Sequence, residues 1–163
     1  MLYVDSSALI KHYIREAGTD ALNAKLSQEL IHHPSVFISV VGYAEVLATF
    51  ARRRKESLLS KREYGQLRQR FRDDWMFELA EVELTAPLTA PVLLFVPNLV
   101  TEHPLKASDA IHLASALWLS DALRLGVNFG PANRSMTFVC SDKRLKNAAS
   151  SEGLEVVDPE DQS

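Results

Sequence analysis

The chain has 163 residues, 47% of them hydrophobic and 24% charged, which fits one globular domain and excludes a disordered or fibrous chain. Its formal net charge of −3 gives no reason by itself to expect a nucleic-acid partner. The longest apolar stretch, Val92 to Val96, is far shorter than the ~20 residues of a transmembrane helix, and the N-terminus lacks the pattern of a signal peptide. We therefore expect a cytoplasmic protein without a membrane span.

Short β-like runs alternate with amphipathic helices along the chain, which is typical of an α/β domain. The first third predicts a strand at 2–5, a helix capped by Ser6 or Ser7, a second helix that opens at 18–20, a strand at 36–38 and a long helix that is capped by Ser39 and runs to Lys55.

The remaining two thirds continue the alternation. Pro97 would remove a hydrogen bond from a helix interior, so the segment 89–103 predicts a broken helix. The other expected elements are a helix from Ser60 to about Trp75, a short strand within 77–84, a helix at 106–125 stopped by Gly126, a loop at 127–135, a strand at 136–140, a helix at 142–151 and a strand at 154–157.

Four acidic residues stand at comparable places in this pattern. Asp5 ends the first strand, Glu45 lies on the helix after the second strand, Asp109 lies near the start of the 106–125 helix, and Asp142 follows the run 136–140. Ligands of α/β sheets bind at such strand-to-helix junctions. Carboxylate oxygens are the ligands that Mg²⁺ and Mn²⁺ prefer, so four acids without obvious cationic partners indicate a metal site.

Each acid also has a structural interpretation. Asp5 could cap the first helix, Glu45 could be a solvated helix residue, and Asp142 could be the N-cap of the last helix. Asp109 lies beside several alanines, which predicts partial burial, and a buried carboxylate is best explained by a metal ion. His112, three residues after Asp109, is expected to pack or form a hydrogen bond rather than bind a metal ion.

The positive charge is concentrated in one segment. Residues 52–72 contain nine Lys and Arg residues and two Glu residues, which gives a local charge of +7. Such a segment can attract a phosphate backbone, and it can equally be the solvated surface of a helical hairpin. The candidate RNA contacts are Arg52, Arg53, Arg54 and Lys55.

Four segments resemble, in order, the motifs of PIN-domain nucleases: Tyr3 to Leu9, the region of Glu45, residues 105–116 and residues 138–145. The most similar subgroup is the VapC-like toxins of toxin-antitoxin pairs. The resemblance implies a PIN-like three-layer α/β sandwich, in which a central, mostly parallel sheet is flanked by helices. It runs from Leu2 to about Pro159, so we expect a single domain at 1–159 and a polar tail at 160–163.

The resemblance also implies a site and an activity. Asp5, Glu45, Asp109 and Asp142 match the family's catalytic, metal-binding acids, and Ser7 matches its supporting hydroxyl residue. The implied cofactor is Mg²⁺ or Mn²⁺, and the implied reaction is endonucleolytic cleavage of single-stranded RNA that leaves 5′-phosphate and 3′-hydroxyl ends. Cys140 departs from the family, which often has Thr or Ser there; the hydroxyl of Ser141 could compensate.

The implied partners are the RNA substrate, a protein antitoxin and a second copy of the chain in a homodimer. Two helices carry more apolar residues than one buried face needs, so we expect a partner to cover part of this set: Leu9, Ile10, Tyr13, Tyr43, Val46, Leu47 and Phe50.

Three alternatives remain. A catalytically silent PIN-like module that binds RNA or protein is the strongest, because a sequence cannot show that a site binds metal. A phosphatase of the haloacid dehalogenase type needs a second Asp where this chain has Ser7, and a phosphoryl-accepting receiver domain needs a Lys for which Lys143 is a loose substitute.

Overall fold

The computed structural model describes residues 1–30, 36–75, 90–126 and 135–162. Within these residues the strands form one parallel sheet with the order β2-β1-β3-β4. The strands are β1 Leu2–Val4, β2 Val36–Phe37, β3 Thr137–Val139 and β4 Glu155–Val157. All neighbouring pairs are parallel, which confirms the predicted α/β class and brings the carboxyl ends of the strands to one edge.

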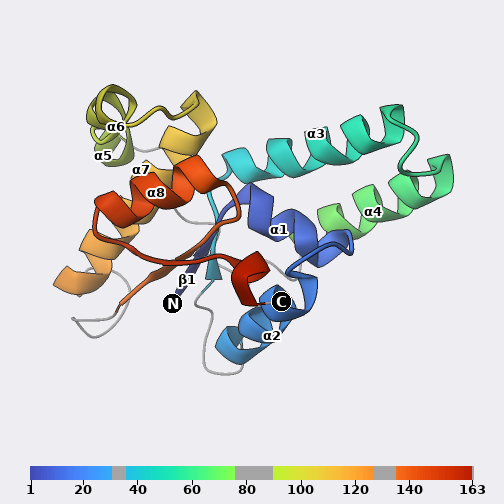
Figure 1. Cartoon of the computed structure of the whole chain (residues 1–163), viewed down its shortest axis with the longest axis horizontal. Coiled ribbons are helices and arrows are strands. Elements are labelled where there is room, and N and C mark those ends of the chain that lie inside the picture. The colour runs from blue at the N-terminus through green and yellow to red at the C-terminus, as the bar shows by residue number, and fades with distance from the viewer. Residues whose placement is uncertain (31–35, 76–89, 127–134, 163) are drawn as a thin grey trace.

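Helices connect and cover these strands (Figure 1). The bounds are α1 Ser6–Tyr13, α2 Thr19–Leu30, α3 Val41–Lys55, α4 Lys61–Asp73, α5 Ala90–Leu93, α6 Val96–Glu102, α7 Ala107–Leu125, α8 Lys143–Ser151 and the 3-10 helix η2 Pro159–Gln162. Figure 1 shows α3 and α4 as a hairpin that projects from the rest of the molecule. None of the described helices is long and apolar enough to cross a bilayer.

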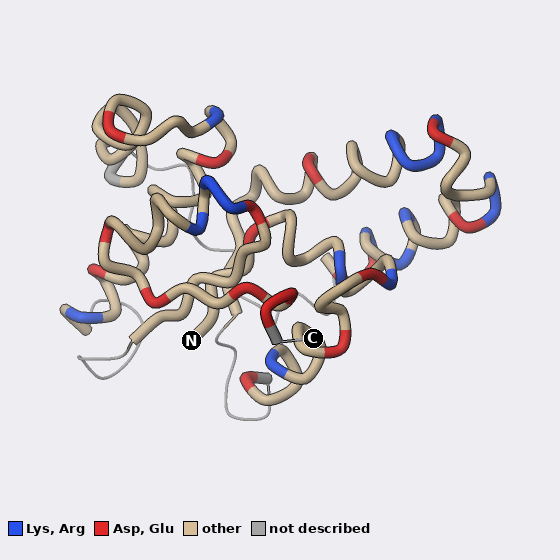
Figure 2. Tube along the Cα trace, in the orientation of Figure 1, with Lys and Arg blue, Asp and Glu red and all other residues tan. Residues whose placement is uncertain are grey.

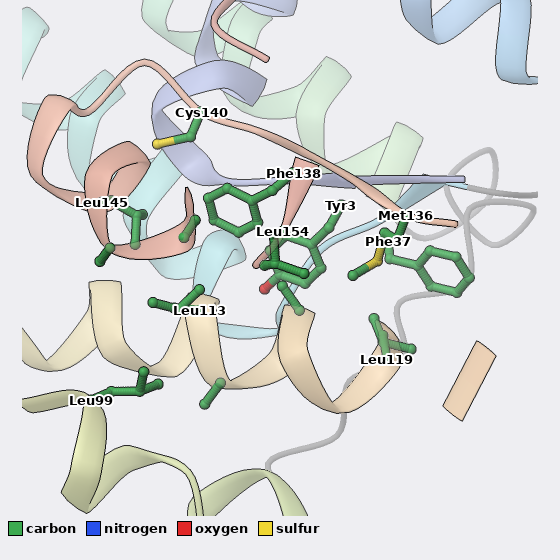
Figure 3. Packing of buried hydrophobic residues seen from close by; sticks show 14 of the residues in the cluster. Tyr3, Phe37, Leu99, Leu113, Leu119, Met136, Phe138, Cys140, Leu145 and Leu154 are labelled. Atoms are coloured by element: carbon green, nitrogen blue, oxygen red, sulfur yellow. The ribbon is translucent and has the colours of Figure 1, made fainter. Parts of the chain in front are cut away.

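The sheet has a hydrophobic core on each face, because successive residues of a strand point to opposite sides. In β1, Tyr3 packs into one core, whereas Leu2 and Val4 pack into the other. The core around Tyr3 is formed with α5, α6, α7 and α8 (Figure 3), and its members include Val92, Leu99, Leu113 and Leu145. Helices therefore cover both faces of the sheet, as the expected three-layer arrangement requires.

The second core contains most of the apolar residues of α1 and α3, the set of which we expected a partner to cover a part. Leu9, Ile10 and Tyr13 of α1 are at most 8% exposed, and Val46 and Phe50 of α3 are fully buried. Tyr43 and Leu47 are half-buried against the same core. α4 folds back and adds Phe71 to this core, so most of the set is buried within the chain. A partner that covers the remaining part stays a prediction.

Phe71 holds α4 in place. It is the one buried residue of α4, and its ring packs against the rings of four other aromatic residues, with centroids 5.2 to 6.0 Å apart. The neighbours are Tyr13, Tyr43, Phe50 and Trp75. The hairpin that carries the basic segment is thus attached to the body through an aromatic cluster.

Two helix starts show one N-cap that was predicted correctly and one that was not. Ser60 caps α4 in a capping box with Glu63, as predicted. The expected cap of α1 by Ser6 or Ser7 was wrong, because Asp5 takes that position and accepts a hydrogen bond from Ala8 N. Both serines instead lie in the first turn of α1.

The described part of the segment 89–103, which begins at residue 90, is a broken helix, as expected, and the break precedes the proline. Residues 94 and 95 separate α5 from α6, and Pro97 lies in the first turn of α6. A proline costs nothing there because its missing N–H would have no partner within the helix. The strand expected within 77–84 and nearly all of the loop at 127–135 lie outside the described residues.

The C-terminal residues pack against the body. η2 contacts α2, and Glu160 Oε1 accepts a hydrogen bond at 2.6 Å from Nζ of Lys11, which is 3% exposed. Glu16 binds the same Nζ at 3.2 Å. Burial lowers the pKa of Lys11, but its two carboxylate partners outweigh that effect and raise it, so Lys11 stays charged.

Candidate active site

Two of the four candidate acids follow neighbouring strands at the carboxyl edge of the sheet. Asp5 directly follows β1, and Asp142 follows β3 after two residues. Asp5 N donates a hydrogen bond to Val139 O at 3.1 Å, which joins the ends of the two strands. Glu45 lies in the second turn of α3 and Asp109 in the first turn of α7.

Asp5 is a buried carboxylate, with 4% of its surface exposed. Its Oδ1 accepts hydrogen bonds from Ala8 N at 3.0 Å and from Ser7 Oγ at 2.9 Å. Burial raises the pKa of Asp5 above its ordinary value, and attraction to His112 and these hydrogen bonds offset only part of that effect. Among the described residues, Asp5 forms no ion pair with Lys or Arg, so a bound cation would favour its charged form.

Ser7 links the ends of β1 and β3. Its Oγ donates to Asp5 and accepts a hydrogen bond from Ser141 N at 3.0 Å. The Ser141 hydroxyl donates to Asp158 Oδ1 at 3.0 Å, so it does not replace the hydroxyl that Cys140 lacks. Cys140 Sγ instead accepts a hydrogen bond from Asp142 N at 3.3 Å. Burial raises the pKa of the Cys140 thiol, which therefore stays neutral.

Asp142 is the N-cap of α8, which is the structural alternative that its sequence left open. Its Oδ1 accepts hydrogen bonds from Arg144 N at 2.9 Å and Leu145 N at 3.0 Å. This role does not exclude a metal contact, because a carboxylate has two oxygens and about four lone-pair directions. The cap fixes the carboxylate beside the strand ends.

Glu45 is held by polar side chains from two other helices. Its Oε2 accepts a hydrogen bond from Ser6 Oγ of α1 and lies 2.8 Å from His112 Nε2 of α7. Burial raises the pKa of Glu45, but hydrogen bonds with His112 and Ser6 and attraction to His112 outweigh it and bring the pKa to about 2. Glu45 is therefore ionised at neutral pH and is not the solvated helix residue of the alternative interpretation.

Asp109 is half-buried, as its alanine neighbours predicted. Its Oδ2 accepts a hydrogen bond from Lys106 N at 3.4 Å as part of a capping box at the start of α7. Asp109 lies in the first turn of α7, and His112 lies one turn further along the helix, where it is buried.

Only one trio of acidic and histidine residues within the described parts of the chain brings its ligand atoms within 4.8 Å of one another. It consists of Glu102, His103 and Glu152, where α6 and α8 end, and it was not expected from the sequence. No three of the four candidate acids bring their carboxylate oxygens within 4.8 Å of one another among the described residues. Such an open set suits Mg²⁺ or Mn²⁺, which usually take few protein carboxylates and complete their shell with water and substrate oxygens.

Three polar residues near these acids form a network that was not predicted from the sequence. Tyr3, Ser6 and His112 form a buried hydrogen-bonded network that ends on Glu45. The available signal was a tyrosine in an otherwise apolar strand directly before Asp5, together with two serines directly after it.

The four basic residues that were candidates for RNA contact lie at the end of α3, at the far end of the hairpin (Figure 2). Arg52, Arg54 and Lys55 are exposed. Arg53 is half-buried and donates to Glu16 Oε2 at 2.5 Å. Arg53 therefore joins α3 to the segment between α1 and α2, whereas the other three side chains are exposed to solvent.

Comparison with known proteins bears on the whole site. The family model of the PIN domain matches residues 2–150, which include all four acids. The chain is 33% identical over 158 residues to Ribonuclease VapC46 of Mycobacterium tuberculosis (strain ATCC 25618 / H37Rv), and the match covers 97% of each protein. It is 30% identical over 130 residues to Ribonuclease VapC45 of Mycobacterium tuberculosis (strain CDC 1551 / Oshkosh), covering 74% of this chain and 78% of that protein.

Proposed function

This chain belongs to the PIN-domain family, within its VapC-like branch, and we propose that it is an endoribonuclease that cleaves single-stranded RNA with a divalent metal ion. The observation that carries the proposal is the burial of the Asp5 carboxylate at an edge of the sheet where Asp142 also lies. Glu45 and Asp109 belong to the same proposed site. A carboxylate buried without Lys or Arg is destabilising unless a bound cation compensates for it.

We assign the metal contacts to Asp5, Glu45, Asp109 and Asp142. A bound Mg²⁺ or Mn²⁺ ion would supply a water of lowered pKa and neutralise charge on the scissile phosphate. Glu45 contributes a fixed negative charge because its pKa is about 2. Ser7 keeps the Asp5 carboxylate oriented through its hydrogen bond to Oδ1. No side-chain nucleophile is required.

The proposed biological setting is a toxin-antitoxin pair in the cytoplasm, where RNA is the substrate and a protein antitoxin holds the enzyme inactive. We also propose a homodimer. The competing candidate is a PIN-like module that binds RNA or protein without catalysis. This candidate has the same fold, but its four acids bind no metal ion.

Mn²⁺ at saturating concentration is expected to raise the melting temperature of the wild-type protein. A ligand that binds only the native state stabilises it by about 2.7 kcal/mol at a hundredfold excess over its Kd. For a chain of this size, 1 kcal/mol shifts the melting temperature by roughly 2–4 °C. Differential scanning fluorimetry over a Mn²⁺ titration measures the shift, and a flat titration to millimolar concentration would favour the silent module.

The trio of Glu102, His103 and Glu152 is the main source of ambiguity in that titration, because it could also bind Mn²⁺. The variant with both Glu102→Gln and Glu152→Gln should keep the shift, whereas Asp5→Asn should lose it. The reverse pattern would move the metal site to the ends of α6 and α8.

The three exposed cations at the end of α3 are proposed to contact RNA phosphates. Changing Arg52, Arg54 and Lys55 together to Gln should weaken RNA binding and flatten its salt dependence by a slope of roughly 0.7 for each lost contact. Arg53 is left unchanged because it binds Glu16. Binding of one RNA is measured at several salt concentrations in Ca²⁺, so that cleavage is slow.

A control variant removes two cations from other surfaces, Lys25→Gln and Arg124→Gln, and should leave the salt slope unchanged. An unaltered slope in the triple variant would contradict the RNA contact and leave the assignment of the acids in place. Mn²⁺ affinity should stay constant in both variants, because the three cations lie at the far end of the hairpin (Figure 2).

A further inference from the structure

His112 is a buried polar residue whose two ring nitrogens both have partners. Its side chain is 2% exposed. Nδ1 lies 3.0 Å from the hydroxyl of Tyr3, and Nε2 lies 2.8 Å from Glu45 Oε2 and 3.1 Å from Ser6 Oγ. A buried imidazole with both nitrogens paired has one orientation, since any rotation would leave a polar atom without a partner.

One hydrogen bond of this network has a fixed direction, because its donor belongs to the backbone. Ser39 N donates to the Tyr3 hydroxyl oxygen at 3.1 Å, and a backbone N–H can act only as a donor. Burial raises the pKa of Tyr3, so its hydroxyl keeps a proton that it can donate to Nδ1 of His112. When Nδ1 accepts this proton, the ring carries its own proton on Nε2, which lies 2.8 Å from Glu45 Oε2.

Glu45 is further restrained by the close approach of α3 to α1. Ser6 Oγ donates to the same carboxylate oxygen that faces His112. Gly42, one turn before Glu45, makes this approach feasible: a Cβ there would lie 2.5 Å from Ile38 Cδ1 and 3.5 Å from Ser6 Oγ. The helix that carries Glu45 is therefore seated against the start of α1.

We propose that His112 is a positioning residue, which fixes the carboxylate of Glu45 for metal binding through hydrogen bonds that run from Ser39 N through Tyr3 and His112 to Glu45 Oε2. The inference rests on the proposed function, because it gives Glu45 a metal to bind. A free Glu side chain loses rotamer entropy when it is immobilised. Because Glu45 is already ordered in the folded protein, metal binding does not pay this entropy cost. Mutation of a residue that orients a metal ligand typically lowers metal affinity or activity 10–100-fold.

Two amide substitutions separate positioning from packing. In His112→Gln the amide nitrogen reaches about as far as Nε2 and can donate to Glu45, whereas the shorter side chain of His112→Asn places its amide near Nδ1. We expect His112→Asn to weaken Mn²⁺ binding to RNA-free protein by 10–100-fold and to raise the Mg²⁺ concentration for half-maximal cleavage similarly. His112→Gln should recover most of both losses, and KM for RNA at saturating Mg²⁺ should change little.

A second measurement uses wild-type protein without metal or substrate, so it does not depend on a substituted protein that folds. Long-range ¹H–¹⁵N spectra of the His112 ring should show a proton on Nε2. An Nε2 without a proton would overturn the proposal, because it could not donate to Glu45.

Other results also decide the matter. Unchanged Mn²⁺ affinity in His112→Asn would overturn the positioning role. So would an equal loss of Mn²⁺ affinity in His112→Asn and His112→Gln that is accompanied by an equal drop in their melting temperatures. If wild-type protein binds no Mn²⁺, the proposed function fails first and the positioning role fails with it.

Discussion

The Asp5→Asn variant is expected to lose metal-dependent RNA cleavage by at least about 100-fold. Mutation of a residue that only supports a metal ligand already lowers activity by up to that factor, and Asp5 is proposed to contact the metal itself. Asn is as good an N-cap as Asp, so the hydrogen bond from Ala8 N and the start of α1 should persist. Single-turnover cleavage at saturating Mg²⁺ measures the loss, and Asp109→Asn should behave alike. Wild-type activity in either variant at limiting Mg²⁺ would remove that acid from the site.

The same substitution should stabilise the metal-free protein in a pH-dependent way. The pKa of Asp5 in the folded protein is raised above its ordinary value of 3.8. Below pH 3.8 the carboxyl group is protonated in both the folded and the unfolded protein, so there is no buried charge to lower the stability. As pH rises from 3.8 through the raised pKa, wild-type protein loses stability and Asp5→Asn does not. The gain should therefore be absent in acid and greatest at neutral pH, as urea unfolding in EDTA would measure.

A matched surface control is Asp20→Asn, which makes the same change at an exposed position in the first turn of α2. It should leave cleavage unchanged and give no stability gain at neutral pH. Saturating Mn²⁺ should reduce or reverse the advantage of Asp5→Asn, since only wild-type protein is stabilised by the ion. An advantage that persists in Mn²⁺ would contradict metal binding by Asp5.

Phe71→Ala is expected to destabilise the protein by about 3–5 kcal/mol, the usual cost of removing a buried Phe side chain. Phe71 is fully buried and contacts four aromatic rings. Because it is the one buried residue of α4, its loss should also release that helix before the rest unfolds. Urea unfolding measures the first effect, and hydrogen exchange of the α4 amides measures the second.

Leu58→Ala is the control for this prediction, since Leu58 lies in the same hairpin and is 66% exposed. It should change stability by no more than about 0.5 kcal/mol. If Phe71→Ala cost as little, α4 would not be anchored by the aromatic cluster, and the proposed RNA contacts on the hairpin would lose their fixed base.

The order of the elements could be predicted because each depends on neighbours in sequence. The helix that ends at Leu125 was predicted to within a residue, since Gly126 adopts the left-handed conformation that ends it. The cap of α1 was assigned to the wrong residue because Asp5, Ser6 and Ser7 are all good N-caps. Only the geometry of the strand end selects Asp5.

Residues that meet only after folding were beyond such reasoning. Tyr3 and His112 are separated by 109 positions, and His112 and Glu45 by 67. Their hydrogen bonds require the sheet to seat α3 and α7 around the start of α1. Similarly, nothing local indicated that α4 would cover the apolar residues of α1 and α3 through Phe71.

Cleavage of a single-stranded RNA, with the ends of the products mapped, tests the central claim most directly. Wild-type protein, Asp5→Asn and Asp20→Asn are compared in Mg²⁺ and in EDTA. The proposed mechanism predicts products with 5′-phosphate and 3′-hydroxyl ends from wild-type protein and Asp20→Asn, in Mg²⁺ only, because water is the nucleophile. Cleavage that survives EDTA, or that Asp5→Asn performs as well as wild-type protein, would contradict it.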